Sequence, residues 1–189
     1  MLKSLTLAFA LTMFLQLSQA QLLQKVLPAT PFADSLAKVV ENYQHNYLDI
    51  QGLALQPDED RDIFASTVGL PGASSCVIYR FHSRQDTTAS WQALLYEGED
   101  FKDASKAYKN AIKHLKQTKF KVGMQKISFA GEVVSPNEDL RFTTSIFKPT
   151  EYTASYKNFI AEVEMLNSIE GWIVRLNLHS RKQDTERYQ

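Results

Sequence analysis

The chain has 189 residues, with 21 basic and 21 acidic side chains and a hydrophobic content of 44%. This balanced charge argues against a dedicated nucleic-acid-binding protein, which usually carries a marked basic excess. Cys76 is the single cysteine, so an intramolecular disulfide is excluded. An aromatic content of 11% and only seven glycines predict a packed globular domain rather than a disordered chain.

The N-terminus has the layout of a signal peptide. Lys3 supplies the positive start, an apolar run follows over residues 5–17, and Ser18 and Ala20 place small residues at a cleavage site. The apolar run is too short to span a bilayer, which takes about 20 apolar residues. We therefore expect cleavage after Ala20 and a periplasmic or secreted product that does not span a membrane. The remaining residues, 21–189, are expected to form a single α+β domain.

Two amphipathic helices are predicted. The first spans residues 31–48, with Thr30 as the N-cap and Pro31 at the first helical position. The second spans residues 101–119 and follows Asp100 as its N-cap. In each helix, apolar residues recur every three or four positions and form one stripe. The stripes consist of Phe32, Leu36, Val39, Val40, Tyr43 and Tyr47 in the first helix, and of Phe101, Ala104, Tyr108, Ala111, Ile112 and Leu115 in the second.

Strands are predicted between the two helices. Residues 50–55 suit a short strand, and residues 75–82 and 88–97 alternate in polarity as half-buried strands do. Because the other face of 88–97 is also apolar, we expect this strand to be central and covered on both sides. Residues 57–75 are rich in proline, glycine and acidic residues and indicate a long loop, although residues 63–68 also suit a short strand.

The last third of the chain is rich in strands, which are predicted over residues 121–134, 140–147, 159–167 and 172–180. The last two strands form a hairpin whose apolar residues have to share one face, which pairs Val163 with Leu176. The same register pairs Glu164 with Arg175 on the outer face. We assign Ser168–Gly171 as a four-residue loop between the strands.

These elements predict an α+β fold with the order α-β-β-α-β-β-β-β. Strands that follow one another without helical crossovers form an antiparallel sheet, here of about six strands. The two amphipathic helices then cover one face of that sheet.

Residues able to carry catalysis or to bind a metal do not form a recognisable motif. Cys76 and His82 lie on one side of a predicted strand, but six residues of strand separate them by about 20 Å, too far for a hydrogen bond. The four histidines lack ligand spacing, and the acidic run 58–62 fails the calcium-loop pattern at Ile63 and Gly69. We therefore predict no catalytic residue, no metal and no cofactor.

The most regular surface feature is a row of lysines opposite the apolar stripe of the second helix, formed by Lys102, Lys106, Lys109, Lys113 and Lys116. No acidic residue interleaves with these lysines at i+4 spacing to neutralise the row. An ordinary solvated helix face is the simpler interpretation. The alternative is a partner-binding row that meets an acidic protein, an anionic polymer or lipid head groups.

A second group of polar residues is predicted on the outer face of the last strands, and it comprises Arg141, Glu162, Glu164, Arg175, Asn177 and His179. Cross-strand pairs of this kind contribute a few tenths to about 1 kcal/mol each. Structural pairing is the simpler interpretation of this group.

Three segments resemble a family of exported Bacteroidetes proteins of unknown function. They are residues 70–73 (LPGA), 90–100 (SWQALLYEGED) and 171–178 (GWIVRLNL). The resemblance covers most of the chain after residue 20 and implies a periplasmic or secreted setting. It implies no activity and no site residues.

Three functions are compatible with these patterns. The first is a non-catalytic binding or interaction module that uses the open sheet face or the lysine row. The second is a small hydrolase with a site near the loop 57–75, and the third is a small-ligand carrier. A deep pocket with converging His, Cys or carboxylate groups favours an enzyme or carrier. A flat sheet with an open edge favours strand addition to a partner.

Overall fold

The structure is a computed structural model that describes residues 31–55, 61–81, 89–151 and 154–181. The predicted signal peptide and its cleavage site lie outside these residues. In chain order, the helices (α), short 3₁₀ helices (η) and strands (β) are α2 (Pro31–Asn42), η1 (Tyr43–His45), η2 (Leu48–Ile50), β1 (Gln51–Ala54), β2 (Arg61–Ser66), β3 (Ser75–Phe81), β4 (Ala89–Gly98), α3 (Phe101–Gln117), β5 (Lys119–Val122), β6 (Gln125–Gly131), β7 (Phe142–Pro149), η3 (Ala154–Tyr156), β8 (Phe159–Ser168) and β9 (Gly171–Ser180).

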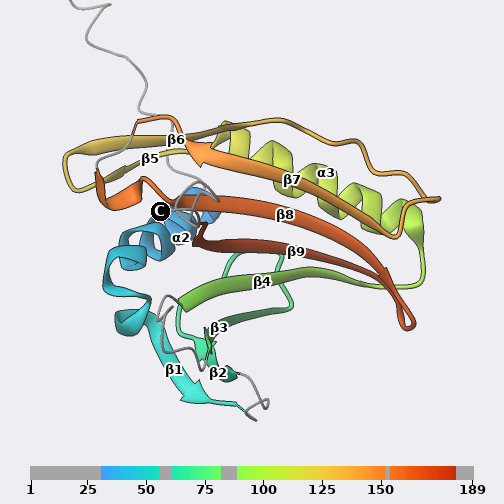
Figure 1. Ribbon diagram of the computed structural model, residues 1–189, viewed down its shortest axis with the longest axis horizontal. Helices are drawn as coiled ribbons and strands as arrows, with labels where there is room; N and C mark the ends of the chain where they lie inside the picture. Colours follow the sequence, from blue (N-terminus) through green and yellow to red (C-terminus); the bar gives the residue numbers. More distant parts are fainter. Residues whose placement is uncertain (1–30, 56–60, 82–88, 152–153, 182–189) are drawn as a thin grey trace, which may run out of the picture.

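The strands form one antiparallel sheet in the order β1-β2-β3-β4-β9-β8-β7-β6-β5 (Figure 1). Each helix is followed by a run of strands that pair with their neighbours in sequence. The last strands of the two runs, β4 and β9, pair at the centre of the sheet. The predicted α+β class with an antiparallel sheet is confirmed. The expected count of about six strands is wrong, because the sheet has nine among the described residues.

Two of the additional strands have a local explanation. Strand β2 lies within residues 57–75, which we expected to be mainly loop, and every one of its residues is only half-buried. Residues 121–134 were expected to be one strand, but the chain reverses at Gly123, whose φ of +59° favours glycine, and forms the β5–β6 hairpin. Strand β2 has no alternation of buried and exposed residues, and β5 has no fully buried residue that would mark it as a separate strand.

The first helix ends at Asn42, earlier than the predicted boundary at residue 48. Asn46 and Tyr47 adopt positive φ angles of 54° and 59°, which no right-handed helix contains. Tyr47 is fully buried, and its hydroxyl donates a hydrogen bond of 2.9 Å to the carbonyl oxygen of Leu178. This tertiary contact outweighs the helical periodicity that led us to extend the helix through Tyr47.

The second helix agrees with its prediction. The Asp100 side chain caps it by accepting a hydrogen bond of 2.9 Å from the Asp103 backbone N–H. The predicted apolar stripe is buried from Ala104 to Leu115, and Phe101 packs against the edge of the core. The helix ends at Gln117, two residues before the expected boundary.

Both helices pack on one face of the sheet, since their buried residues join alternate strand residues in one hydrophobic core. Figure 1 shows α3 lying along the sheet and α2 near the β5–β6 end. In β4, Trp91 and Ala93 are fully buried, whereas Gln92 and Leu94 on the other face are half-buried. The expectation that β4 is covered on both sides is therefore wrong, although its central position is confirmed.

The register of the β8–β9 hairpin is confirmed, with Val163 opposite Leu176 and Glu164 opposite Arg175. The four-residue loop is wrong, because Ser168 and Gly171 pair with each other and only two residues form the turn. Gly171 has a φ of +113°, and a Cβ there would lie 2.6 Å from the carbonyl oxygen of Gly98. Glycine therefore permits the tight turn and its close approach to β4. No helix in the described parts of the chain is long and apolar enough to cross a bilayer.

Candidate functional site

The face of the sheet opposite the two helices carries ordered polar side chains, and we call it the helix-free face. Side chains alternate along a strand, so each residue between two core residues points to this face. Strand β9 shows the alternation from Trp172 to Leu178, with every second residue buried and the others half-buried. Within the described residues, both helices contact only the opposite face. Among the residues that the structure describes, no helix therefore covers the helix-free face.

A chain of hydrogen bonds crosses this face from β3 to β8. The Tyr79 hydroxyl donates to Gln92 Oε1 at 3.2 Å, Gln92 Nε2 donates to Asn177 Oδ1 at 2.8 Å, and Asn177 Nδ2 donates to Glu164 Oε2 at 2.7 Å. An ionised carboxylate only accepts, so Glu164 requires the Asn177 amino group on its side. Asn177 Oδ1 then faces Gln92 and accepts from its amino group, which leaves Gln92 Oε1 to accept from Tyr79. The side-chain amides of Gln92 and Asn177 are thus each held in one orientation.

A second hydrogen-bonded group lies beside this chain and is centred on Glu162. The Thr144 hydroxyl donates to Glu162 Oε1 at 3.2 Å, and His179 Nε2 lies 3.0 Å from Glu162 Oε2. His179 Nδ1 lies 3.2 Å from the carbonyl oxygen of Ser180. Both ring nitrogens of His179 therefore lie within hydrogen-bond distance of an oxygen atom.

The environment of Glu162 favours its ionised form. The hydrogen bond from His179 lowers the pKa of Glu162 below its ordinary value, with further lowering from the charge of His179 and the hydroxyl of Thr144. Burial acts in the opposite direction but is the smaller effect. Glu162 and His179 thus form a hydrogen-bonded pair that is largely shielded from water, with side-chain exposures of 17% and 24%.

A hollow of about 320 Å³ opens on the helix-free face over the Tyr79–Gln92–Asn177 chain. The Arg61 guanidinium lies 4.6 Å from the centre of the Tyr79 ring and stacks on it. Phe81 leaves 47% of its surface exposed at the same place. The lining comes from four neighbouring strands and consists of Arg61, Tyr79, Phe81, Ser90, Gln92, Asn177, His179 and Ser180. We call this the polar hollow.

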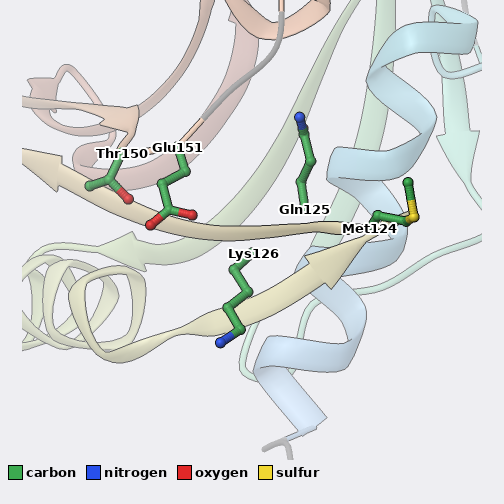
Figure 2. Close-up of a pocket in the computed structure, with 5 residues that line it drawn as sticks. All are labelled: Met124, Gln125, Lys126, Thr150 and Glu151. Atoms are coloured by element: carbon green, nitrogen blue, oxygen red, sulfur yellow. The ribbon is translucent and has the colours of Figure 1, made fainter.

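A larger hollow of about 640 Å³ lies at the β5–β6 turn, but its lining side chains do not form a cluster of functional groups. Figure 2 shows its lining residues, Met124, Gln125, Lys126, Thr150 and Glu151. Gln125 and Lys126 point to opposite sides of β6, and Met124 lies at the turn (Figure 2). Met124 is fully exposed. These side chains do not converge on a common point, so this hollow is a poor candidate for a site.

The lysine row occupies the place that its spacing predicts. Lys102, Lys106, Lys109, Lys113 and Lys116 are all exposed on the side of α3 that faces away from the sheet. Three of them, Lys109, Lys113 and Lys116, line a third hollow of about 310 Å³ beside α3. The row and the polar hollow lie on opposite sides of the molecule.

The outer-face residues predicted from the sequence are brought together only in part. Glu162, Glu164, Asn177 and His179 belong to the two hydrogen-bonded groups. Arg141 instead precedes β7 and is exposed. The contributions of β2, β3 and β4 were not predicted, because the hairpin register relates only the final strands to one another. The polar residues Ser90 and Gln92, which alternate with buried ones in β4, were the available signal.

Cys76 and the histidines do not assemble a nucleophilic centre among the described residues. Cys76 pairs with Ala93 in the ladder and faces the helix side of the sheet, opposite to His179. Burial raises the pKa of the Cys76 thiol, partly offset by a hydrogen bond from the Leu70 backbone N–H. His114 stacks on Phe32 with ring centres 4.9 Å apart.

The other histidines and the acidic run form no catalytic or metal-binding group among the described residues. His45 is hydrogen-bonded to Asp49. His82 and residues 58–60 of the acidic run lie outside the described residues. Across the described ranges, no three His, Cys, Asp or Glu side chains gather closely enough to hold a metal ion.

Comparisons with known proteins give no match. No protein-family model matches the chain. No curated protein and no solved structure matches it either. The resemblance to exported Bacteroidetes proteins stays a prediction.

Proposed function

We propose that this protein is an exported, non-catalytic binding module that takes a saccharide in the polar hollow. The observation that carries the proposal is the hydrogen-bonded chain of Tyr79, Gln92 and Asn177 beneath exposed aromatic surface. Binding sites typically combine apolar or aromatic surface with a few polar groups fixed in orientation. The polar hollow has both features.

The remaining hydrogen-bond donors and acceptors of the two amides favour a ligand rich in hydroxyl groups. Within the chain, Gln92 and Asn177 each use one N–H and one oxygen lone pair. Each amide therefore keeps one further N–H and one further lone pair for a ligand. A hydroxyl group donates and accepts at once, so it suits such a pair of groups better than a purely anionic or purely cationic ligand does.

The aromatic residues favour a saccharide over a smaller alcohol. A sugar ring has an apolar C–H face as well as hydroxyl groups at its edge. Phe81 offers an exposed ring for that face, and Arg61 covers one side of the Tyr79 ring. The ligand thus places its ring near Phe81 and its hydroxyl groups on the amides.

The alternatives have less support. The described lining of the polar hollow contains no carboxylate and no cysteine, and Glu162 is already paired with His179. Of the described residues between 61 and 75, within the region where we placed a hydrolase site, Arg61 is the one that lines this hollow. A carrier would enclose its ligand between sheet and helices, whereas the polar hollow lies on the other face. Export rests on the predicted signal peptide and on the resemblance to exported proteins.

Saturation-transfer NMR with neutral monosaccharides and short oligosaccharides tests the proposal. We expect transfer to at least one sugar with the wild-type protein, and its loss in Phe81→Ala and in the double variant Gln92→Ala/Asn177→Ala. Lys148→Ala is the matched control, since Lys148 is exposed on β7 and does not line the hollow. If no sugar shows transfer, or if the hollow variants bind as the control does, the proposal is wrong.

A further inference from the structure

A second surface, on the helix side of the molecule, also has the form of a binding site. The extended segment 132–137 follows β6 and passes beside α3. A hollow of about 310 Å³ lies between them. One wall consists of Lys109, Lys113 and Lys116, and the other of Val133, Val134 and Pro136. We call it the lysine groove.

The apolar wall of the lysine groove is fixed in place by three hydrogen bonds. The Val134 backbone N–H donates to Ser145 Oγ at 2.8 Å. Ser145 Oγ lies 2.7 Å from the Tyr108 hydroxyl, which donates to the Val134 carbonyl oxygen at 3.2 Å. This closed ring ties segment 132–137 to α3 and to β7. Val133 and Val134 nevertheless leave 45% and 42% of their surfaces exposed.

The lysines of the row make no close ion pair within the described part of the protein. The helix sequence after Asp103 contains no acidic residue. Five lysines therefore follow one side of α3, and three of them lie beside exposed apolar side chains.

We propose that the lysine groove binds a linear acidic polysaccharide. Lys102 and Lys116 are fourteen residues apart, so the row extends over about 21 Å of helix. A small anion reaches only part of such a row, whereas a linear polymer of acidic sugars meets all five lysines. Each acidic sugar also has an apolar ring face, which suits the wall formed by Val133, Val134 and Pro136. The two walls thus match the two sides of one polymer.

An acidic protein matches the groove less well. A folded protein surface can meet the exposed lysines without contacting the apolar wall of the groove. An occupant that contacts both walls has to enter the hollow between α3 and segment 132–137. A flexible acidic peptide can do so, but its carboxylates do not require the apolar wall. Binding of an acidic polysaccharide should therefore depend on Val133 and Val134, whereas binding of an acidic peptide should not.

The test measures binding of polygalacturonate, poly-glutamate and neutral dextran to the full-length protein by calorimetry. We expect polygalacturonate to bind with an affinity that falls as salt is added, and dextran not to bind in the groove. The variant Lys106→Glu/Lys109→Glu/Lys113→Glu should weaken polygalacturonate binding by at least about tenfold. Lys116 is retained because it stabilises the negative end of the α3 dipole.

Two further variants decide the outcome. The matched control, Lys119→Glu/Lys121→Glu/Lys126→Glu, changes the same charge at exposed positions on β5 and β6 and should bind as the wild type does. Val133→Ser/Val134→Ser should weaken polygalacturonate but not poly-glutamate. Equal loss in both lysine variants, equal binding of the two polymers, or no binding of polygalacturonate overturns the proposal. None of these outcomes depends on the polar hollow.

Discussion

The two faces of the central strands differ in what their side chains do, although successive residues of the same strands supply both faces. On the helix side, Trp91 and Leu176 are fully buried and join one continuous apolar core. On the helix-free face, their neighbours Gln92 and Asn177 are half-buried and hydrogen-bond to each other. One face thus removes apolar surface from water, and the other holds polar groups at fixed positions.

This contrast assigns stability and recognition to different faces. Burying a large apolar side chain contributes about 1.5–3 kcal/mol, whereas a hydrogen bond contributes about 1 kcal/mol after its exchange with water. The polar face is therefore a weak source of stability. Its ordered amides and the polar hollow are better explained by binding. Four predictions, from the largest expected effect to the smallest, test this division and the account of the lysine groove.

Trp91→Ala should lower the free energy of unfolding by about 3–5 kcal/mol, because it removes a fully buried indole and leaves a cavity. It also removes the hydrogen bond of 2.9 Å from the indole N–H to Ser66 Oγ. Gln92→Ala, one residue along the same strand, should cost about 1 kcal/mol or less. Urea denaturation of both variants measures the two values. Similar losses would remove the proposed difference between the faces.

Tyr108→Phe should lower the free energy of unfolding by about 1–2 kcal/mol, because it breaks the hydrogen-bonded ring with Ser145 and Val134. Hydrogen exchange should accelerate at the Val134 amide, whose partner Ser145 is then less well held. Tyr96→Phe is the control, since its hydroxyl bonds to the exposed Asp100 carbonyl oxygen. If Tyr96→Phe costs as much, the ring does not fix the wall of the lysine groove.

Glu162→Gln should cost about 1 kcal/mol at neutral pH and flatten the stability profile in acid. The pKa of Glu162 is below its ordinary 4.5 in the folded protein. Its contribution is therefore present above that ordinary value and is lost as the pH falls through the lowered one. We expect thermal melts between about pH 5 and pH 3 to show a smaller decline in Tm for the variant than for the wild type. The exposed Glu138→Gln should leave the profile unchanged.

Lys106→Glu/Lys109→Glu/Lys113→Glu should leave the Tm almost unchanged, because all three side chains are exposed and unpaired within the described chain. Differential scanning calorimetry measures this directly. A large fall in Tm would show that the row stabilises the fold, and the loss of polymer binding in this variant would then have a structural cause.

Local periodicity accounts for the parts of the fold that were predicted well. The stripe of α3 and the apolar faces of β8 and β9 have clear periods, and both the buried face of α3 and the hairpin register are confirmed. Tyr47 shows the opposite case, because its helical spacing is overruled by its hydroxyl bond to Leu178 in a distant strand. Strands β2 and β5 have half-buried or exposed residues and so lack the contrast that periodicity needs.

The candidate site was predicted only in part for a related reason. Glu164 and Asn177 were placed on one face from the hairpin register alone. Gln92 and Tyr79 join them because β4 pairs with β9 at the centre of the sheet, a contact between residues 85 positions apart in the case of Gln92 and Asn177. No local pattern indicates which strands pair across that distance. The lysine row was predicted, whereas the groove beside it depends on how segment 132–137 packs.

Chemical-shift mapping of the ¹⁵N-labelled protein during titration with the sugar that gives the strongest saturation transfer tests the central claim most directly. We predict that the perturbed signals gather on the helix-free face, with the side-chain amides of Gln92 and Asn177 among the largest and the lysine groove unaffected. Perturbations centred on α3, or spread evenly over both faces of the sheet, would contradict the assignment of binding to the polar hollow.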